Sequence, residues 1–199
     1  INRPKGLSPV QNGDGTVWSA GDTLFCIPAS DSTNTYAVGD AIALAAGSDA
    51  NGIPNVTKWT GSNVAAGVIV GVRTADPGTS LVGTDLSLST TYVPQSKSRA
   101  YYVYVATDPA TVFALQGDST VWATTHMNYN CTVTVSAAQS GLGMSSPFSN
   151  MVATSPNTTN TLPLQILGLV QSPDNGFGAY ANLLVRFNVH AGLGGRTGV

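Results

Sequence analysis

Short apolar runs separated by turn-rich polar segments are the main pattern of this chain. Val64–Arg73 is apolar at nearly every position, which predicts a strand buried on both faces, and its two glycines indicate a bulge or the close approach of another chain. Ala100–Ala106 alternates, with Tyr102 and Tyr104 on one face and Tyr101 on the other together with the valines. Further strands are predicted at Thr23–Pro28, Ala41–Ala46, Val56–Trp59, Asp85–Val93, Val112–Gln116, Cys131–Val135, Leu162–Val170 and Leu183–Val189.

Turn signals divide these runs, and helical patterns are nearly absent. Asn51-Gly52 is typical of a hairpin turn, whereas Gln139–Thr161 reads as a long polar loop. Only Asp108–Gln116 could hold a turn or two of helix. We therefore predict an all-β chain with long loops and very little helix. An extended N-terminal arm, residues 1–19, would precede a single compact domain, barrel-like or sandwich, over residues 20–199.

The composition narrows the classes of function. Only 9% of the residues are charged, against about 25% in ordinary globular proteins, and the chain contains no Glu. Hydrophobic residues make up 42%, which is enough for a folded core. The eight basic residues are scattered and the net charge is −2, so we expect no direct contact with nucleic acid. No apolar run approaches a membrane span or a signal peptide, and we expect no membrane partner.

Residues that usually carry chemistry are few and poorly spaced. His126 and His190 lack neighbours at metal-ligand spacing, and Cys26 and Cys131, which could be bridged, are better explained as buried thiols. There is no nucleophile elbow and no phosphate-binding loop, and the missing Glu removes the last ligand of an EF-hand loop. Many of the ten Asp stand in turn-forming sequences. We expect no enzymatic activity, no metal and no cofactor.

A series of short motifs runs in order along nearly the whole chain. They are Gly6–Val10, Cys26–Pro28, Val38–Asp40, Ala66–Val72, Tyr102–Pro109, Val112–Gln116, Leu164–Leu169, Pro173–Asn175 and Leu184–His190. Together they resemble the tailed-bacteriophage capsid decoration (cement) protein family. Thr107 and Ala114 stand where such relatives often carry an acidic residue, in keeping with the general loss of Glu.

This resemblance implies a structural virion protein on the outer surface of an icosahedral capsid, made in the cytoplasm of the bacterial host. Its relatives commonly act as homotrimers that bridge subunits of the major capsid protein, without a cofactor. Low charge and repeated weak contacts also suit a protein that packs against copies of itself. As candidate contacts with the capsid or with further copies we take Arg3, Pro4, Lys5, Leu7, Trp18, Tyr101 and Tyr102.

An alternative function of a different class remains open. The chain could be a carbohydrate-binding or host-adsorption module displayed on the virion. The polar stretch Gln139–Thr161 and exposed Tyr or Trp rings would then contact sugars.

Overall fold

The computed structural model describes residues 2, 4–19, 22–73, 91–135 and 149–193, which are nearly all strand and loop. The all-β prediction is confirmed. Within the described residues the only helical element is a 3₁₀ turn, η1, at Thr124–His126. The strands are β1 Ser8–Gln11, β2 Asp22–Ile27, β3 Tyr36–Ala37, β4 Ala41–Ser48, β5 Pro54–Lys58, β6 Gly67–Arg73, β7 Tyr92–Val93, β8 Tyr101–Ala106, β9 Val112–Gln116, β10 Asn130–Thr134, β11 Val152–Asn157, β12 Leu164–Leu169 and β13 Asn182–Phe187.

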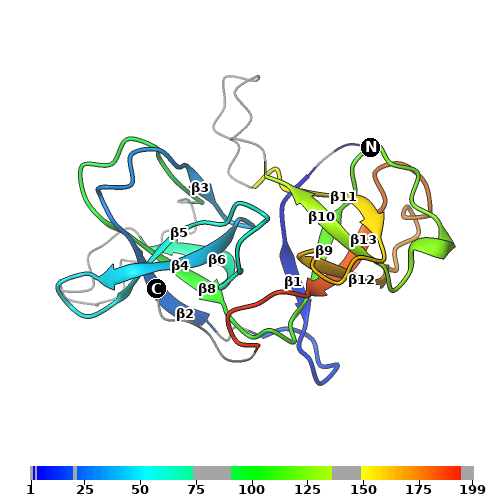
Figure 1. Cartoon of the computed structure of the whole chain (residues 1–199), viewed down its shortest axis with the longest axis horizontal. Helices are drawn as coiled ribbons and strands as arrows, with labels where there is room; N and C mark the ends of the chain where they lie inside the picture. Colours follow the sequence, from blue (N-terminus) through cyan, green and yellow to red (C-terminus); the bar gives the residue numbers. More distant parts are fainter. Residues whose placement is uncertain (1, 3, 20–21, 74–90, 136–148, 194–199) are drawn as a thin grey trace.

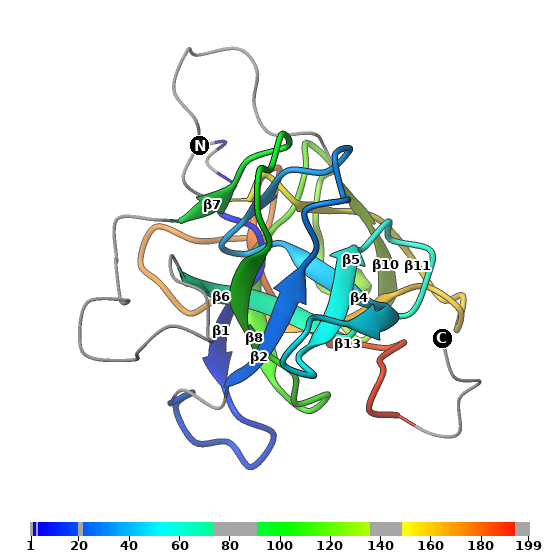
Figure 2. The ribbon, with the colours of Figure 1, turned by 90° about the vertical axis from the view of Figure 1, so that its left-hand side faces the viewer.

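The first half of the chain forms a closed barrel of five strands in the order β2-β5-β4-β6-β8. It lies on the left of Figure 1 and faces the viewer in Figure 2, with the small β3–β7 pair beside it. The alternation in β8 sets its orientation, because Val103 and Val105 are fully buried in the barrel interior and Tyr101 packs against the same cluster. Interior positions on neighbouring strands are Phe25, Ile27, Ile42, Val56, Ile69 and Val72.

Strand β6 confirms both predictions made for its sequence. Val68 and Ile69 are fully buried on opposite faces, Ile69 in the barrel interior and Val68 in a second core. The pairing with β8 shifts between Ile69 and Gly71, which is the expected bulge. A Cβ on Gly67 would lie 2.3 Å from the carbonyl oxygen of Ala106, so the close approach is made by β8 of the same chain.

The second half of the chain, joined by β1 from the first half, forms a six-stranded sheet in the order β1-β9-β13-β12-β10-β11. This sheet curls until its last strand approaches β9, where Ala153 forms a bridge with Gly117 and accepts a hydrogen bond of 2.9 Å from the Asp118 amide. The predicted closing hairpin is confirmed as the antiparallel pair β12–β13. Residues of the two strands fill the interior of the curled sheet together with Phe113 and Leu115 of β9.

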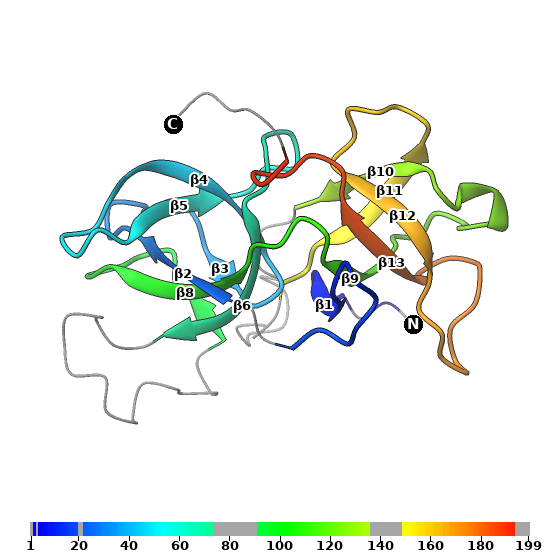
Figure 3. The same ribbon diagram turned by 90° about the horizontal axis from the view of Figure 1, so that it is seen from below.

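The two β units share one core at their junction. Trp59 of the barrel packs edge-on against Phe187 of β13, with ring centroids 5.8 Å apart. The Leu7 amide donates to the Gly39 carbonyl at 2.9 Å, so the first segment of the chain is tied to the barrel as well as to the sheet. Figure 3 shows the two units side by side, with β1 close to their boundary. The continuous junction core favours one cooperative folded body.

Several segments differ from the sequence-based expectation. Part of the predicted N-terminal arm belongs to the fold, because β1 pairs with β9. Val112–Gln116, for which the sequence allowed a strand or a short helix, forms strand β9. The polar stretch predicted as a loop contains strand β11, while its residues 139–148 lie outside the described residues. Of the predicted strand Asp85–Val93, the described part contains only β7. Cys26 and Cys131 are buried thiols with no disulfide between them, as expected.

Candidate assembly surfaces

The structure distributes the predicted contact residues between core and surface. Leu7 is only 1% exposed and Tyr102 only 4%, so these side chains offer almost no area to a partner. The Tyr102 hydroxyl donates to Asp49 at 2.8 Å, which accounts for its polar end. Lys5 is the exposed member of the set among the described residues.

The other predicted contacts are half-buried or not described. Trp18 packs against the junction core, and Tyr101 packs against the barrel interior with the Arg99 guanidinium 5.7 Å from its ring centroid. Pro4 is half-buried, and Arg3 lies outside the described residues. The fold therefore places Leu7 and Trp18 at the junction core and Tyr101 at the barrel interior, while Lys5 stays exposed.

Other apolar side chains are exposed, and they form two separate groups. The largest exposed fractions among the described hydrophobic residues are those of Val17 at 82%, Val121 at 71%, Leu193 at 54% and Phe177 at 46%. All four follow or stand within turn-rich polar sequence, where no neighbouring strand buries the side chain. Their place in turn-rich sequence was the one sequence signal that indicated exposure, because an apolar side chain in a turn has no strand alternation to direct it into a core.

We group Val17, the half-buried Pro109 and Leu193 as the hairpin patch, because Gly13 of the Val17 hairpin and Gly192, next to Leu193, each pack against the turn that contains Pro109. Val17 follows a tight turn in which Asp14 accepts hydrogen bonds from the Thr16 amide and hydroxyl, at 2.9 and 2.6 Å. These bonds lower the pKa of Asp14, which keeps the carboxylate charged. A Cβ on Gly13 would lie 2.3 Å from the Ala110 Cβ, so the hairpin packs closely on the turn that contains Pro109.

Leu193 follows Gly192, which packs against the same turn. A Cβ on Gly192 would lie 3.2 Å from the ring of Pro109. Gly192 donates its amide to Nδ1 of the buried His190 at 2.8 Å, and Ala191 donates to the Ala65 carbonyl at 2.7 Å. The three members of the hairpin patch are therefore presented by backbone segments that hydrogen bonds and close packing hold in place.

The second group, which we call the rim patch, consists of Val121 and Phe177. Trp122 and Gly178 form an antiparallel bridge with amide–carbonyl distances of 3.2 and 3.0 Å. Side chains alternate on such a pair, so burial of Trp122 turns Val121 and Phe177 outward together. The Asn175 side chain fixes the loop by donating to the carbonyls of Val170 and Asn182, each at 2.8 Å, and by accepting from the Asn182 amide at 2.9 Å.

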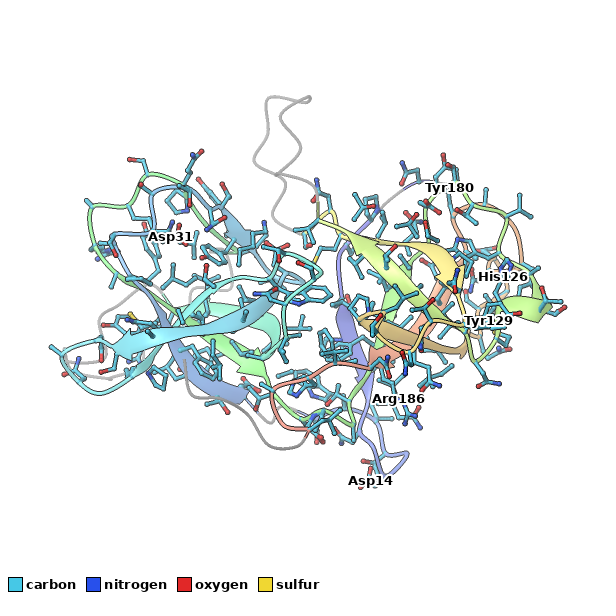
Figure 4. The ribbon with its side chains drawn as sticks, viewed as in Figure 1. Asp14, Asp31, His126, Tyr129, Tyr180 and Arg186 are labelled. Carbon is cyan, nitrogen blue, oxygen red and sulfur yellow. The ribbon has the colours of Figure 1, made fainter. Side chains whose placement is uncertain are left out.

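Aromatic side chains continue the surface beside the rim patch. The His126 ring lies edge-on to Trp122 at 6.2 Å and is 6.0 Å from the Tyr129 ring. Its Nδ1 accepts the Ala123 amide at 3.2 Å, which leaves Nε2 to carry the proton of the neutral ring. Figure 4 places His126 and Tyr129 at one end of the molecule, whereas Asp14 of the hairpin lies at its lower edge. The hairpin that contains Asp14 and the aromatic side chains beside the rim patch thus lie in different parts of the molecule.

The described residues offer no cluster of side chains that could hold a metal ion. No group of three or more His, Cys, Asp or Glu side chains gathers anywhere in that part of the chain. Burial raises the pKa of the Cys131 thiol to about 12, so it is a poor nucleophile at neutral pH. The ion pair of Asp40 and Lys58, at 3.1 Å, is buried at the barrel. Asp40 also accepts a hydrogen bond from the Ala37 amide, and Lys58 donates to the Thr35 carbonyl, so the pair has a structural role.

Comparisons with protein-family models, with curated proteins and with solved structures found no match. Among the described residues, no helix has the length and apolar character needed to cross a membrane.

Proposed function

We propose that this chain is a structural protein that decorates and cements the outer face of an icosahedral phage capsid. It would bind the major capsid protein and further copies of itself, as a homotrimer, and so bridge neighbouring shell subunits. The observation that supports this proposal is the presence of two separate groups of exposed apolar side chains, one at the hairpin and one beside the Trp122–Gly178 bridge. A protein that bridges two partners needs at least two such surfaces, whereas a simple binding module needs one.

The patches are small, and the proposed mechanism is suited to small contacts. Two or three apolar side chains bury too little area for a stable one-to-one complex. On an icosahedral shell the same contact repeats in every symmetry-related copy, and linked contacts gain strength by effective concentration. Each bridge would then add to the free energy needed to separate capsid subunits.

The charges near the patches favour particular neighbours. Asp14 and Asp108 stand beside the hairpin patch, and both accept backbone amides: Thr16 donates to Asp14 at 2.9 Å and Ala110 to Asp108 at 2.8 Å. A partner surface that meets Val17 and Leu193 would therefore face two fixed carboxylates. We expect it to supply apolar side chains flanked by basic or hydrogen-bond-donating groups.

The closure of the barrel and the covered edge of β1 also support a role in which many copies lie close together. Open strand edges pair with other chains and cause aggregation. The barrel has no free edge, and the outer side of β1 is covered by the bridge from Gln11 to Val17 and by the Trp18 amide, which donates to Val10 at 3.2 Å. Contacts between copies would thus run through side chains, which give specific geometry.

The test compares capsids that lack this chain with capsids to which the purified protein has been added back. We expect added protein to raise the temperature at which capsids release DNA, and we expect Val17→Asp and Phe177→Asp each to weaken this effect at least tenfold in the concentration required. Thr158→Asp, an exposed position outside both patches, is the matched control and should behave as wild type.

Two outcomes would overturn the proposal. Capsids without the chain could prove as resistant to heat and chelator as decorated ones. Alternatively, both patch variants could protect capsids as well as the control does. The alternative of a carbohydrate-binding or host-adsorption module stays a prediction, and residues 139–148 of its proposed loop lie outside the described residues.

A further inference from the structure

A hollow of about 310 Å³ opens in the second β unit where β1 begins beside β9. Ser8, the first residue of β1, pairs with Ala114, whereas the preceding residues around Gly6 lie against the barrel. On the other side β11 reaches β9 only at Gly117. The end of β9 is therefore flanked by a gap between two strands. The described residues that line it are Lys5, Gly6, Ser8, Ala114, Leu115, Gln116 and Asn182.

The walls of the hollow are rigid. Gly6 is wedged between the two β units, because a Cβ there would lie 2.4 Å from both the Gly39 carbonyl oxygen and the Ser149 Cβ. Gln116 is only 6% exposed, and its amide nitrogen lies 3.5 Å from the Tyr180 carbonyl. The backbone of Asn182 is clamped by the Asn175 side chain through two hydrogen bonds. A ligand would meet a largely preformed site, which lowers the entropic cost of binding.

The chemistry of the lining is mixed and carries one positive charge. Lys5 brings an ammonium, Ser8 a hydroxyl, and Gln116 and Asn182 bring amides, while Ala114 and Leu115 are apolar. No carboxylate is present among the described lining residues. Asp118, two residues after Gln116, accepts its bonds from the Thr120 amide at 2.9 Å and the Thr154 hydroxyl at 2.6 Å, beside β11.

This combination selects a class of ligand. Amides and hydroxyls both donate and accept hydrogen bonds, as the hydroxyls of a sugar do, whereas phosphate oxygens mainly accept. The small apolar side chain of Ala114 suits the C–H face of a sugar ring, and the single ammonium of Lys5 suits a single carboxylate. The volume corresponds to about ten water molecules and stands at the lower end of the range for ligand pockets, about 300–1,000 Å³.

We propose that this hollow binds one acidic sugar ring, with its carboxylate at Lys5 and its hydroxyls at Ser8, Gln116 and Asn182. The site does not depend on the capsid-cementing role, because none of its lining residues belongs to either apolar patch. A decoration protein with such a site could also hold a virion against an acidic surface polysaccharide.

The experiment is a titration of the full-length ¹⁵N-labelled protein with glucuronate, followed by two-dimensional NMR. We expect saturable shifts confined to the amides of residues around the hollow, and much weaker shifts with glucose or acetate. Lys5→Gln should weaken glucuronate binding about tenfold because it removes a charge-assisted contact. Lys5→Arg should retain binding. Lys5 is exposed, so we expect the substitutions to leave the melting temperature unchanged.

Arg186→Gln is the matched control, since it removes the same charge from an exposed position of β13 that lies outside the lining. The proposal is overturned if glucuronate causes no saturable shifts, if the shifts map elsewhere, or if both Gln variants weaken binding equally. Equal binding of acetate would show an anion site without sugar recognition and would also overturn it. Capsid protection, measured separately, would be unaffected by any of these results.

Discussion

At the scale of single residues, Gly6 controls how the first strand meets both β units. Its φ of +69° lies in the left-handed region that side chains disfavour. Its α-carbon also faces backbone and side-chain atoms of the barrel and of Ser149, with no room for a further carbon atom. Conformation and space thus act together at this position.

We expect Gly6→Ala to lower the free energy of unfolding by about 2–4 kcal/mol, because the Cβ must displace the Gly39 carbonyl or Ser149. Gly52→Ala is a matched control: its φ is +79°, but nothing lies within 4 Å of its Cβ position, so only the strain of about 1 kcal/mol applies. Urea unfolding of the two variants measures the difference. Equal losses would show that the close approach at Gly6 has no energetic consequence.

The pattern of apolar residues predicted burial well inside long strands, where several successive positions follow the same alternation. The faces of β8 and the double burial of β6 followed from the spacing of apolar residues. The same reasoning could not separate Leu7 from Val17, since both are single aliphatic residues in a polar segment. What decides their burial is the docking of β1 between distant parts of the chain, and that information is not local.

At the scale of elements, a polar cluster fixes the loop that precedes β3. Asp31 accepts hydrogen bonds from the Asn34 amide at 3.2 Å, from the Asn34 side chain at 3.0 Å and from the Tyr36 hydroxyl. Lys97 donates to the main-chain carbonyls of Asp31 and Asn34, at 2.5 and 2.9 Å, and lies 5.4 Å from the Tyr36 ring centroid. One carboxylate and one ammonium therefore join this loop to the segment after β7.

This cluster predicts a loss of stability in acid. Burial alone would raise the pKa of Asp31, but the hydrogen bonds from Tyr36 and Asn34 hold it below its ordinary value. A lowered folded-state pKa contributes stability above the unfolded value of about 3.9, and that stability is lost as the pH falls through the folded value. We expect Asp31→Asn to unfold more easily at pH 6 and to lose less stability between pH 5 and pH 2 than wild type. Parallel pH profiles of the urea midpoint would contradict this.

Two of the strands that sequence reasoning missed, β1 and β11, share a physical cause. Strand β1 contains Pro9 and polar residues, and β11 contains Pro156 between the exposed Ser155 and Asn157, which favour turns. Both stand at the ends of the six-stranded sheet, where a strand needs hydrogen bonds on only one side and tolerates proline. Edge strands of this kind gain their order from the neighbouring strand and carry little periodicity of their own.

At the scale of the whole molecule, the junction core should make the two β units unfold together. Trp59, Ala65 and Val68 from the barrel region belong to the same buried cluster as Phe113, Leu183 and Phe187 of the sheet. Separating the units would expose all of these side chains, at a cost of about 25 cal/mol for each Å² of apolar surface. A single transition is therefore expected.

The two cysteines test this expectation, because Cys26 lies in barrel strand β2 and Cys131 in β10 of the sheet. Both are buried, so alkylation requires unfolding of the surrounding structure. We expect the two thiols to become reactive at the same urea concentration, measured by mass spectrometry of labelled peptides. Reaction of one thiol well before the other would show two independently stable units and not the single domain expected for residues 20–199.

The strand order has a consequence for how the chain matures on the ribosome. All strands of the barrel lie between Asp22 and Ala106, so this unit can close while the remainder is still being made. The curled sheet, in contrast, recruits β1 from the start of the chain to strands that end at Phe187. At about 5–20 residues per second, synthesis from Ala106 to Phe187 takes on the order of 4–16 seconds. During that interval the first strand must wait beside a finished barrel, without the partner that later holds it.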